Sequence, residues 1–282
     1  MTLQEIKNLY KSILSERYSD TETNTLFTLL AEEILKVNPV RQRQMLHDEL
    51  AEETERQFTN YLSKLETGQP YQQVIGKTEF YGLQFFVNEH VLIPRPETEE
   101  LLEIAISKIE DSFGNRNIRI LDIGTGSGVI PIVLKKHFPE AEITSIDYSE
   151  AALEVARRNA TQHQTQIRFK HQDYLNTELD ECYEVIISNP PYIGLDEKEE
   201  ISVTVKNFEP LMALFSPTEN PLVFYEKIAG DALEHLAEHG LVLLEINQKL
   251  GHQTLDLFIH SFSEAHLVQD ISDNDRFIIG KK

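Results

Sequence analysis

The sequence holds a single cysteine, Cys182, among its 282 residues. A disulfide scaffold is therefore excluded, and one thiol suits a reducing compartment. Metal-ligating spacings are missing as well. The ten histidines are scattered, and only His235 and His239 stand four residues apart. Because no third ligand accompanies that pair in the sequence, we expect no metal site.

Long apolar segments are equally scarce. No run approaches the roughly 18 apolar residues that read as a membrane-spanning helix, and the N-terminus has no apolar signal core. We therefore expect a cytoplasmic protein without a membrane partner. Internal repeats and low-complexity segments are also absent from the sequence.

Basic residues are outnumbered, with 26 Lys and Arg against 47 Asp and Glu, for a formal net charge of −21. A protein that grips nucleic acid through its phosphates usually carries a basic face. The short pairs Lys135-Lys136 and Arg157-Arg158 fall on predicted helices, where they are interpreted as solvated surface. We expect a protein or small-molecule partner and no direct binding of nucleic acid.

The first 77 residues carry apolar residues at helical spacing, as in Leu3, Ile6 and Tyr10. Residues 45–50 continue the pattern, so a bundle of four or five helices is predicted for 1–77. Residues 79–93 change to a period of two, which predicts a β-hairpin that turns at Asn88-Glu89-His90. The hairpin and a stiff proline-containing connection form the predicted linker, 78–96.

Strand and helix patterns alternate from residue 97 to the end of the chain. This alternation predicts an α/β domain, 97–282, built on a doubly wound sheet. The predicted strands span 118–123, 142–147, 166–170, 183–188, 241–246 and 276–280.

A glycine-rich turn follows the first of these strands, before a helix that begins at Val129. Its residues are Gly124, Thr125, Gly126, Ser127 and Gly128. Strand, glycine turn and helix form the crossover that binds nucleotides, because glycines let a ligand approach the backbone. The next strand ends at Asp147, about 20 residues on, where an acid holds ribose hydroxyls. The G-x-G-x-G spacing and Asp122 favour a cationic ligand over a pyrophosphate, which indicates S-adenosylmethionine.

The stretch Asn189-Pro190-Pro191-Tyr192 opens a loop after the apolar strand 183–188. The Asn189 side-chain carbonyl and the Pro190 backbone carbonyl can both accept hydrogen bonds from one NH2 group, and the Tyr192 ring can stack on its plane. The alternative is a plain proline turn. Asp173 and Tyr174 end another strand; they are either a turn or an adenine contact. All these residues fall at strand carboxyl ends, where ligands of such sheets bind.

These motifs, together with the stretch LIPRPETE at 92–99, resemble those of the protein-(glutamine-N5) methyltransferases that modify peptide chain release factors. The resemblance also covers LDIGTGSGVI at 121–130, ISNPPYIG at 187–194 and FEPLMAL at 208–214. It implies a class I methyltransferase fold, S-adenosylmethionine as methyl donor and S-adenosylhomocysteine as product. It implies a glutamine in a Gly-Gly-Gln loop as acceptor, docked with help from the helical bundle.

Carried over position by position, the resemblance assigns the methionine and ribose to the glycine turn, the ribose hydroxyls to Asp147 and the adenine to Tyr174. It assigns the glutamine amide to residues 189–192. Asn189, Pro190 and Tyr192 are the expected catalytic residues. Arg95 either lines the acceptor pocket or forms a structural ion pair. We expect a monomer.

The sequence departs from the family pattern at three places: residues 216–221 replace a glycine-rich turn, and Asn247 and Asp273 replace glycines. Two other functions remain open at this point. An adenine-N6 methyltransferase would use the same tetrapeptide, because adenine also presents a planar NH2 group. A non-catalytic S-adenosylmethionine-binding scaffold is the second.

Overall fold

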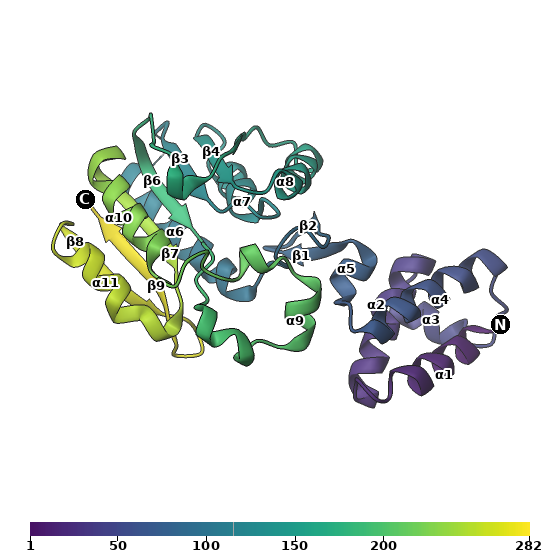
Figure 1. Cartoon of the computed structure of the whole chain (residues 1–282). Coiled ribbons are helices and arrows are strands. Elements are labelled where there is room, and N and C mark those ends of the chain that lie inside the picture. The colour runs from purple at the N-terminus through teal and green to yellow at the C-terminus, as the bar shows by residue number, and fades with distance from the viewer. Residues whose placement is uncertain (115) are drawn as a thin grey trace. The chain divides into compact units, whose positions relative to one another are not determined.

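The computed structural model describes residues 1–114 and 116–282. Within these, the chain divides into two compact units, Met1–Lys77 and Thr78–Lys282. The smaller unit is helical (Figure 1). Its helices are α1 Leu3–Leu14, α2 Asp20–Leu35, α3 Pro39–Gln44, α4 Glu52–Thr67 and α5 Tyr71–Ile75.

Side-chain caps fix where the first helices begin. Thr2 and Glu5 form a capping box at α1, and Ser19 and Glu22 form another at α2. Inside the bundle, the Tyr10 hydroxyl donates to the Phe58 carbonyl at 2.8 Å, which satisfies a buried polar group. The prediction of helix at 45–50 is wrong: this segment lies between α3 and α4. Its backbone pairs instead with the first residues of the chain.

A β-hairpin follows, with β1 Lys77–Phe80 and β2 Leu83–Phe86. Its turn is Tyr81-Gly82, with φ of 52° and 66°, so the predicted turn at Asn88-Glu89-His90 is wrong. Two successive positive φ angles are typical of the tight turn whose twist matches a hairpin. Tyr81 tolerates this conformation because it is hydrogen-bonded to the helix that spans Pro96–Phe113. Its N–H donates to Glu99 at 2.7 Å, and its hydroxyl donates to Glu103 at 2.6 Å.

The larger unit is an α/β fold around one seven-stranded sheet of order β5-β4-β3-β6-β7-β9-β8. Its strands are β3 Arg119–Ile123, β4 Glu142–Asp147, β5 Arg168–His171, β6 Tyr183–Ser188, β7 Leu236–Glu245, β8 Glu264–Gln269 and β9 Asp275–Lys281. The strands from β5 to β7 are parallel, and β9 runs antiparallel between β7 and β8. The edge strand β8 was not predicted, because its sequence EAHLVQ gives only a short apolar signal, and none of its residues is fully buried.

Helices cover both faces of this sheet (Figure 1). They are α6 Pro96–Phe113, α7 Val129–His137, α8 Glu150–Gln162, α10 Val223–His235 and α11 Gly251–Ile259. The short helix α9 Val203–Phe208 contributes no residue to either core. Successive strand residues alternate between the two cores: Val185 and Ile187 pack with α6 and α7, and Ile186 packs with α10 and α11. All three are fully buried, as expected of a parallel strand covered on both faces.

Strand order reverses between β3 and β6, because the chain moves outward to β4 and β5 before it returns to β6 on the other side of β3. Open α/β sheets bind ligands in the crevice that this reversal leaves at the carboxyl ends of the strands. The glycine turn follows β3, and Asn189 follows β6. The topology therefore brings the two main sequence motifs together.

Candidate active site

A cavity of about 760 Å³ lies at the carboxyl ends of these strands. Its walls come from the hairpin connection, the glycine turn, the ends of β4 and β6, and the segment before α10. The lining includes Arg95, Thr98, Gly124, Thr125, Gly126, Ser127, Asp147, Asp173, Tyr174, Asn189 and Pro191. Gly128, Pro190 and Tyr192 do not belong to it.

The glycines of the turn differ in what surrounds them, and therefore in why a glycine is needed at each position. All three have positive φ, with Gly126 at 52° and Gly124 and Gly128 at 83°. A Cβ on Gly126 would meet no atom within 4 Å, so this backbone borders open space. A Cβ on Gly128 would lie 3.1 Å from the Cβ of Ala156 in α8. Gly126 is thus open to a ligand, whereas Gly128 permits α7 and α8 to pack closely.

Asp147 ends β4 with its carboxylate held by backbone N–H groups. Gly126 N donates to Oδ2 and Ser149 N donates to Oδ1, each at 2.8 Å. Burial raises the pKa of this carboxyl, while these two hydrogen bonds work to lower it. Each oxygen keeps lone pairs for further donors, such as paired sugar hydroxyls. The turn and the acid therefore fit the ribose of a nucleoside ligand.

Asp122, the acid that precedes the glycine turn in the sequence, does not lie at the cavity as Asp147 does. It is fully buried, does not line the cavity and accepts a short hydrogen bond from Ser145. Burial raises its pKa to about 7. The idea that Asp122 faces a cationic ligand is therefore wrong, because its carboxylate lies inside the core.

Asn189 follows β6 with its amide oriented by a neighbour. Its Nδ2 donates to the Thr98 hydroxyl at 3.1 Å. Thr98 is buried and donates to the Glu245 carboxylate at 2.7 Å. Of the described residues, none donates to Asn189 Oδ1. This oxygen remains as a hydrogen-bond acceptor on a residue that lines the cavity.

Tyr192 supports the site from behind. Its ring packs against the core shared with α10 and α11, and its hydroxyl donates to Glu245 at 3.3 Å. Burial, and then the charge of Glu245, raise the pKa of this hydroxyl. Pro190 is also buried. In this conformation Tyr192 is half-buried against that core and is not among the residues that line the cavity.

Arg95 pairs with Glu209. Its Nη2 lies 2.6 Å from Glu209 Oε1, and Glu209 Oε2 accepts from the Ile93 N–H at 3.0 Å. The Glu209 side chain is only 1% exposed, against 34% for Arg95. This contact joins the connection between β2 and α6 to the segment Phe208-Glu209-Pro210. The structural ion pair that was one of the two expectations for Arg95 is therefore present. Arg95 also lines the cavity.

Asp173 and Tyr174 lie at the end of β5, where both line the cavity. Asp173 Oδ2 accepts from Asn176 Nδ2 at 2.8 Å. Tyr174 is 4% exposed and packs in the core beneath, with the Lys227 ammonium 5.0 Å from its ring centre. It therefore offers little ring surface for stacking in this conformation. The neighbouring Leu175 and Asn176 complete that wall.

Several wall residues were missed by sequence reasoning. The apolar wall facing the glycine turn contains Leu211, Met212, Phe215 and Phe224, and Leu211 and Met212 are each 48% exposed. Thr98 was missed too, although the LIPRPETE stretch that contains it had been noted. These residues come from loops and helix ends, where no periodic pattern marks them.

Two of the departures from the family pattern, at Asn247 and Asp273, differ in how well the residue suits its local backbone. Asn247 has φ of −66°, which any residue adopts, and its side chain donates to Glu197 at 2.7 Å. Asp273 has φ of 61°, the left-handed region that favours glycine. The neighbouring Asp270 accepts from Arg276 at 3.1 Å and from two backbone N–H groups of the turn.

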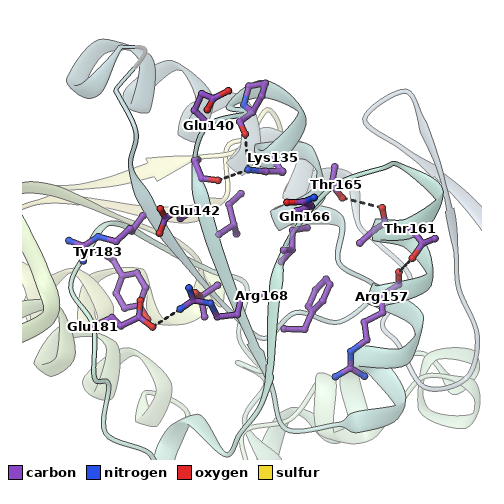
Figure 2. Close-up of a pocket in the computed structure, with 18 residues that line it drawn as sticks. Lys135, Glu140, Glu142, Arg157, Thr161, Thr165, Gln166, Arg168, Glu181 and Tyr183 are labelled. Carbon is purple, nitrogen blue, oxygen red and sulfur yellow. Dashed lines mark hydrogen bonds and ion pairs between the residues drawn. The ribbon is translucent and has the colours of Figure 1, made fainter.

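A second hollow, of about 710 Å³, lies at the amino ends of the strands (Figure 2). Its cations already have partners. Arg168 lies 2.7 Å from Glu181, Arg119 pairs with Glu184, and Lys135 donates to two backbone carbonyls. The glycine turn of the first cavity is also not among the residues that line this hollow.

The residues that the structure describes contain no group of three or more His, Cys, Asp or Glu placed to hold a metal ion. None of the helices they form has the length and apolar content needed to cross a membrane.

Comparison with known proteins gives matches over both units. The family model "PrmC N-terminal domain" matches residues 5–76, and "Methyltransferase small domain" matches 102–208. A methyltransferase structure from Pyrococcus furiosus aligns with a TM-score of 0.51 at 20% identity, covering 72% of this chain and 90% of that one. The larger unit thus has the class I methyltransferase fold.

Two curated relatives are close in sequence and length. The release factor glutamine methyltransferase of Flavobacterium psychrophilum is 43% identical over 79% of each chain. The protein of the same name from Streptococcus pneumoniae is 41% identical over 83% of each chain. The chain therefore belongs to the family of release factor glutamine methyltransferases.

Proposed function

We propose that this protein transfers a methyl group from S-adenosylmethionine to the side-chain amide nitrogen of a glutamine in a peptide chain release factor. The glutamine is that of the Gly-Gly-Gln loop, and S-adenosylhomocysteine is the other product. The observation that carries the proposal is Asn189 at the cavity, with its Nδ2 bound to Thr98 and its Oδ1 left to accept. Family membership supports the choice of acceptor.

The cavity fits the donor. Gly126 presents an open backbone, and Asp147 is oriented for sugar hydroxyls. Asp173, Tyr174 and Leu175 form the wall where the adenine would lie. When bound, S-adenosylmethionine supplies an electrophilic methyl group. In this arrangement residues 124–127 hold the methionine and ribose, while Gly128 keeps the turn against α8.

The acceptor nitrogen needs orientation more than it needs a base. An amide nitrogen is a poor nucleophile, because its lone pair is delocalised into the carbonyl. Asn189 Oδ1 and the Pro190 carbonyl would accept the two amide protons and aim the nitrogen. Both acceptors would also stabilise the positive charge that develops as the N–C bond forms and the methyl–sulfur bond breaks. The nitrogen would then lose one of its protons, made acidic by methylation, to solvent. Orientation of this kind supplies about 7–11 kcal/mol at best.

The remaining motif residues have supporting parts in this proposal. Pro191 lines the cavity beside Asn189, and Tyr192 fixes the loop through Glu245. Arg95 holds Glu209 and borders the acceptor end. Residues 1–77 are proposed to help dock the release factor, 78–96 to link, and 97–282 to catalyse. We further propose a monomeric cytoplasmic enzyme without a resident metal.

The test is peptide mass spectrometry of an unmodified release factor incubated with the protein and S-adenosylmethionine. We expect one added methyl, on the glutamine of the Gly-Gly-Gln loop. Asn189→Ala should lose most turnover, whereas Gln253→Ala, which removes an exposed amide on α11, should not. A methyl found on an adenine-bearing nucleic acid instead would establish the adenine-methylating alternative. No transfer to either acceptor would favour a non-catalytic scaffold.

A further inference from the structure

Four polar side chains form one hydrogen-bonded chain: Asn189 and Thr98 line the cavity, and Glu245 and Tyr192 continue the chain away from it. Asn189 Nδ2 donates to Thr98 Oγ1 at 3.1 Å, and Thr98 Oγ1 donates to Glu245 Oε2 at 2.7 Å. The Tyr192 hydroxyl donates to Glu245 Oε1 at 3.3 Å. The chain begins at the end of β6, passes through the first turn of α6 and reaches the last residue of β7.

The direction of this chain follows from its proton count. A carboxylate only accepts, and a threonine hydroxyl has one proton to give. Once Thr98 gives that proton to Glu245, it can only accept from Asn189. The NH2 end of the Asn189 amide therefore faces Thr98, and the carbonyl end is left for the cavity. Without Thr98, the amide could rotate by 180° and present a donor where an acceptor is needed.

The geometry points to Thr98 and Glu245 as positioning residues for methyl transfer, which hold the Asn189 carbonyl toward the acceptor amide. This inference rests on the proposed function and adds two residues to it. Neither residue is at the surface: Thr98 is 3% exposed and Glu245 is 1% exposed. Buried polar groups at such depth are normally satisfied, and here each satisfies the next.

The direction of the hydrogen bonds from Asn189 through Thr98 depends on Glu245 being ionised, so the groups around this carboxylate affect the orientation of Asn189. Burial raises its pKa to about 7; the Thr98 hydrogen bond and the Arg276 charge lower it, and the Glu97 charge raises it. Tyr192 donates to the carboxylate, and Tyr225 from α10 donates to the Glu245 backbone carbonyl. A protonated Glu245 could donate to Thr98 and release the constraint on Asn189. Turnover should therefore fall as the pH drops through the folded pKa.

The variants are Thr98→Val, Thr98→Ser and Glu245→Gln. Thr98→Val keeps the shape and removes the hydroxyl, so we expect kcat to fall about 100-fold, as for a displaced catalytic group. Thr98→Ser restores the hydroxyl and should return kcat to within about threefold of the native enzyme. The dissociation constant for S-adenosylmethionine should stay the same in all three, because the proposed donor contacts are the glycine turn and Asp147, and the Thr98 and Glu245 side chains hydrogen-bond to neither.

The dependence of kcat on pH distinguishes a positioning role from a merely structural one, because a structural role would not change the shape of that profile. The acid limb of kcat near neutral pH should be present in the native enzyme and Thr98→Ser, and absent in Glu245→Gln. Equal kcat in Thr98→Val and the native enzyme would overturn the positioning role. So would a Glu245→Gln variant that keeps the native acid limb, and this comparison decides the matter if Thr98→Val does not fold. Failure of the native enzyme to methylate glutamine would instead overturn the proposed function.

Discussion

The Arg95 guanidinium and the Glu209 carboxylate meet at 2.6 Å across 114 positions of sequence. Glu209 has no other cation within ion-pairing distance among the residues that the structure describes. Its second oxygen accepts from the Ile93 backbone. One carboxylate thus holds both the hairpin connection and the segment Phe208-Glu209-Pro210, and both of these loops contribute residues to the cavity wall.

Arg95→Ala should therefore destabilise the larger unit. Removing one partner of a fully buried pair costs about 3–5 kcal/mol, and the partial exposure of Arg95 reduces this to about 1–3 kcal/mol. Urea unfolding measures the change. Arg157→Ala, which breaks a surface pair with Glu150, is the matched control and should cost less than about 1 kcal/mol. Equal losses in the two variants would contradict a buried pair.

The Gly128→Ala substitution should destabilise the fold by about 1–3 kcal/mol. It places an alanine at a positive φ, which disfavours any residue with a Cβ, and it brings that Cβ to 3.1 Å from Ala156. Gly82→Ala separates the two effects. Gly82 has φ of 66° and open space around it, so only the backbone penalty of about 1–2 kcal/mol applies. Thermal unfolding of both variants tests the difference. A larger loss in Gly82→Ala would show that packing at Gly128 is unimportant.

Asp122→Asn should raise stability in a pH-dependent way. Burial raises the Asp122 pKa from 3.8 to about 7, the Ser145 hydrogen bond opposes this, and the Asp147 charge adds to it. The folded state thus binds a proton that the unfolded state has released between these values. Stability from this group is present below about pH 4 and is lost as the pH rises through about 7.

Calorimetry at two pH values checks this prediction. At pH 8 the Asp122→Asn melting temperature should exceed the native one by about 2–4 °C, as expected for about 1 kcal/mol in a domain of this size. At pH 5 the difference should shrink. Glu245 titrates with the same sign, so the variant should keep part of the native pH dependence. An equal shift at both pH values would exclude titration of Asp122 as the cause.

Substitutions at Asp273 measure the effect of backbone conformation on stability without a change in core packing, because the side chain is exposed and φ is 61°. Asp273→Gly should change stability by less than about 1 kcal/mol, since strain relief and chain entropy oppose each other. Asp273→Val should cost about 1–2 kcal/mol, because a β-branched residue fits this region poorly. Urea unfolding distinguishes the two. A Val variant as stable as the Gly variant would show that the turn has adopted another conformation.

The parts of the site that could be predicted from sequence are those encoded within a few residues. The glycine turn after β3, Asp147 after β4 and Asn189 after β6 each combine a local motif with a strand end. Parallel strands place such ends at one edge of a sheet, so their convergence follows without tertiary detail.

The remainder depends on contacts between distant residues. Thr98 and Glu245 are 147 positions apart, and neither stands out in its own segment. The hairpin turn was misplaced because Tyr81 adopts a positive φ only with support from Glu99 and Glu103. Burial of the Tyr192 ring likewise depends on α10 and α11, which follow it in the chain.

In the hairpin, the outer edge of β2 would otherwise be free to pair with another strand. Side chains of α8 occupy it: Asn159 accepts from Phe86 N–H at 2.7 Å and donates to Phe86 O at 3.0 Å, while Gln162 and His163 contact the Gln84 carbonyl. Asn159 therefore imitates the peptide group of a neighbouring strand. The outer edge of β2, capped in this way by side chains, gives no template for edge-to-edge pairing with another molecule.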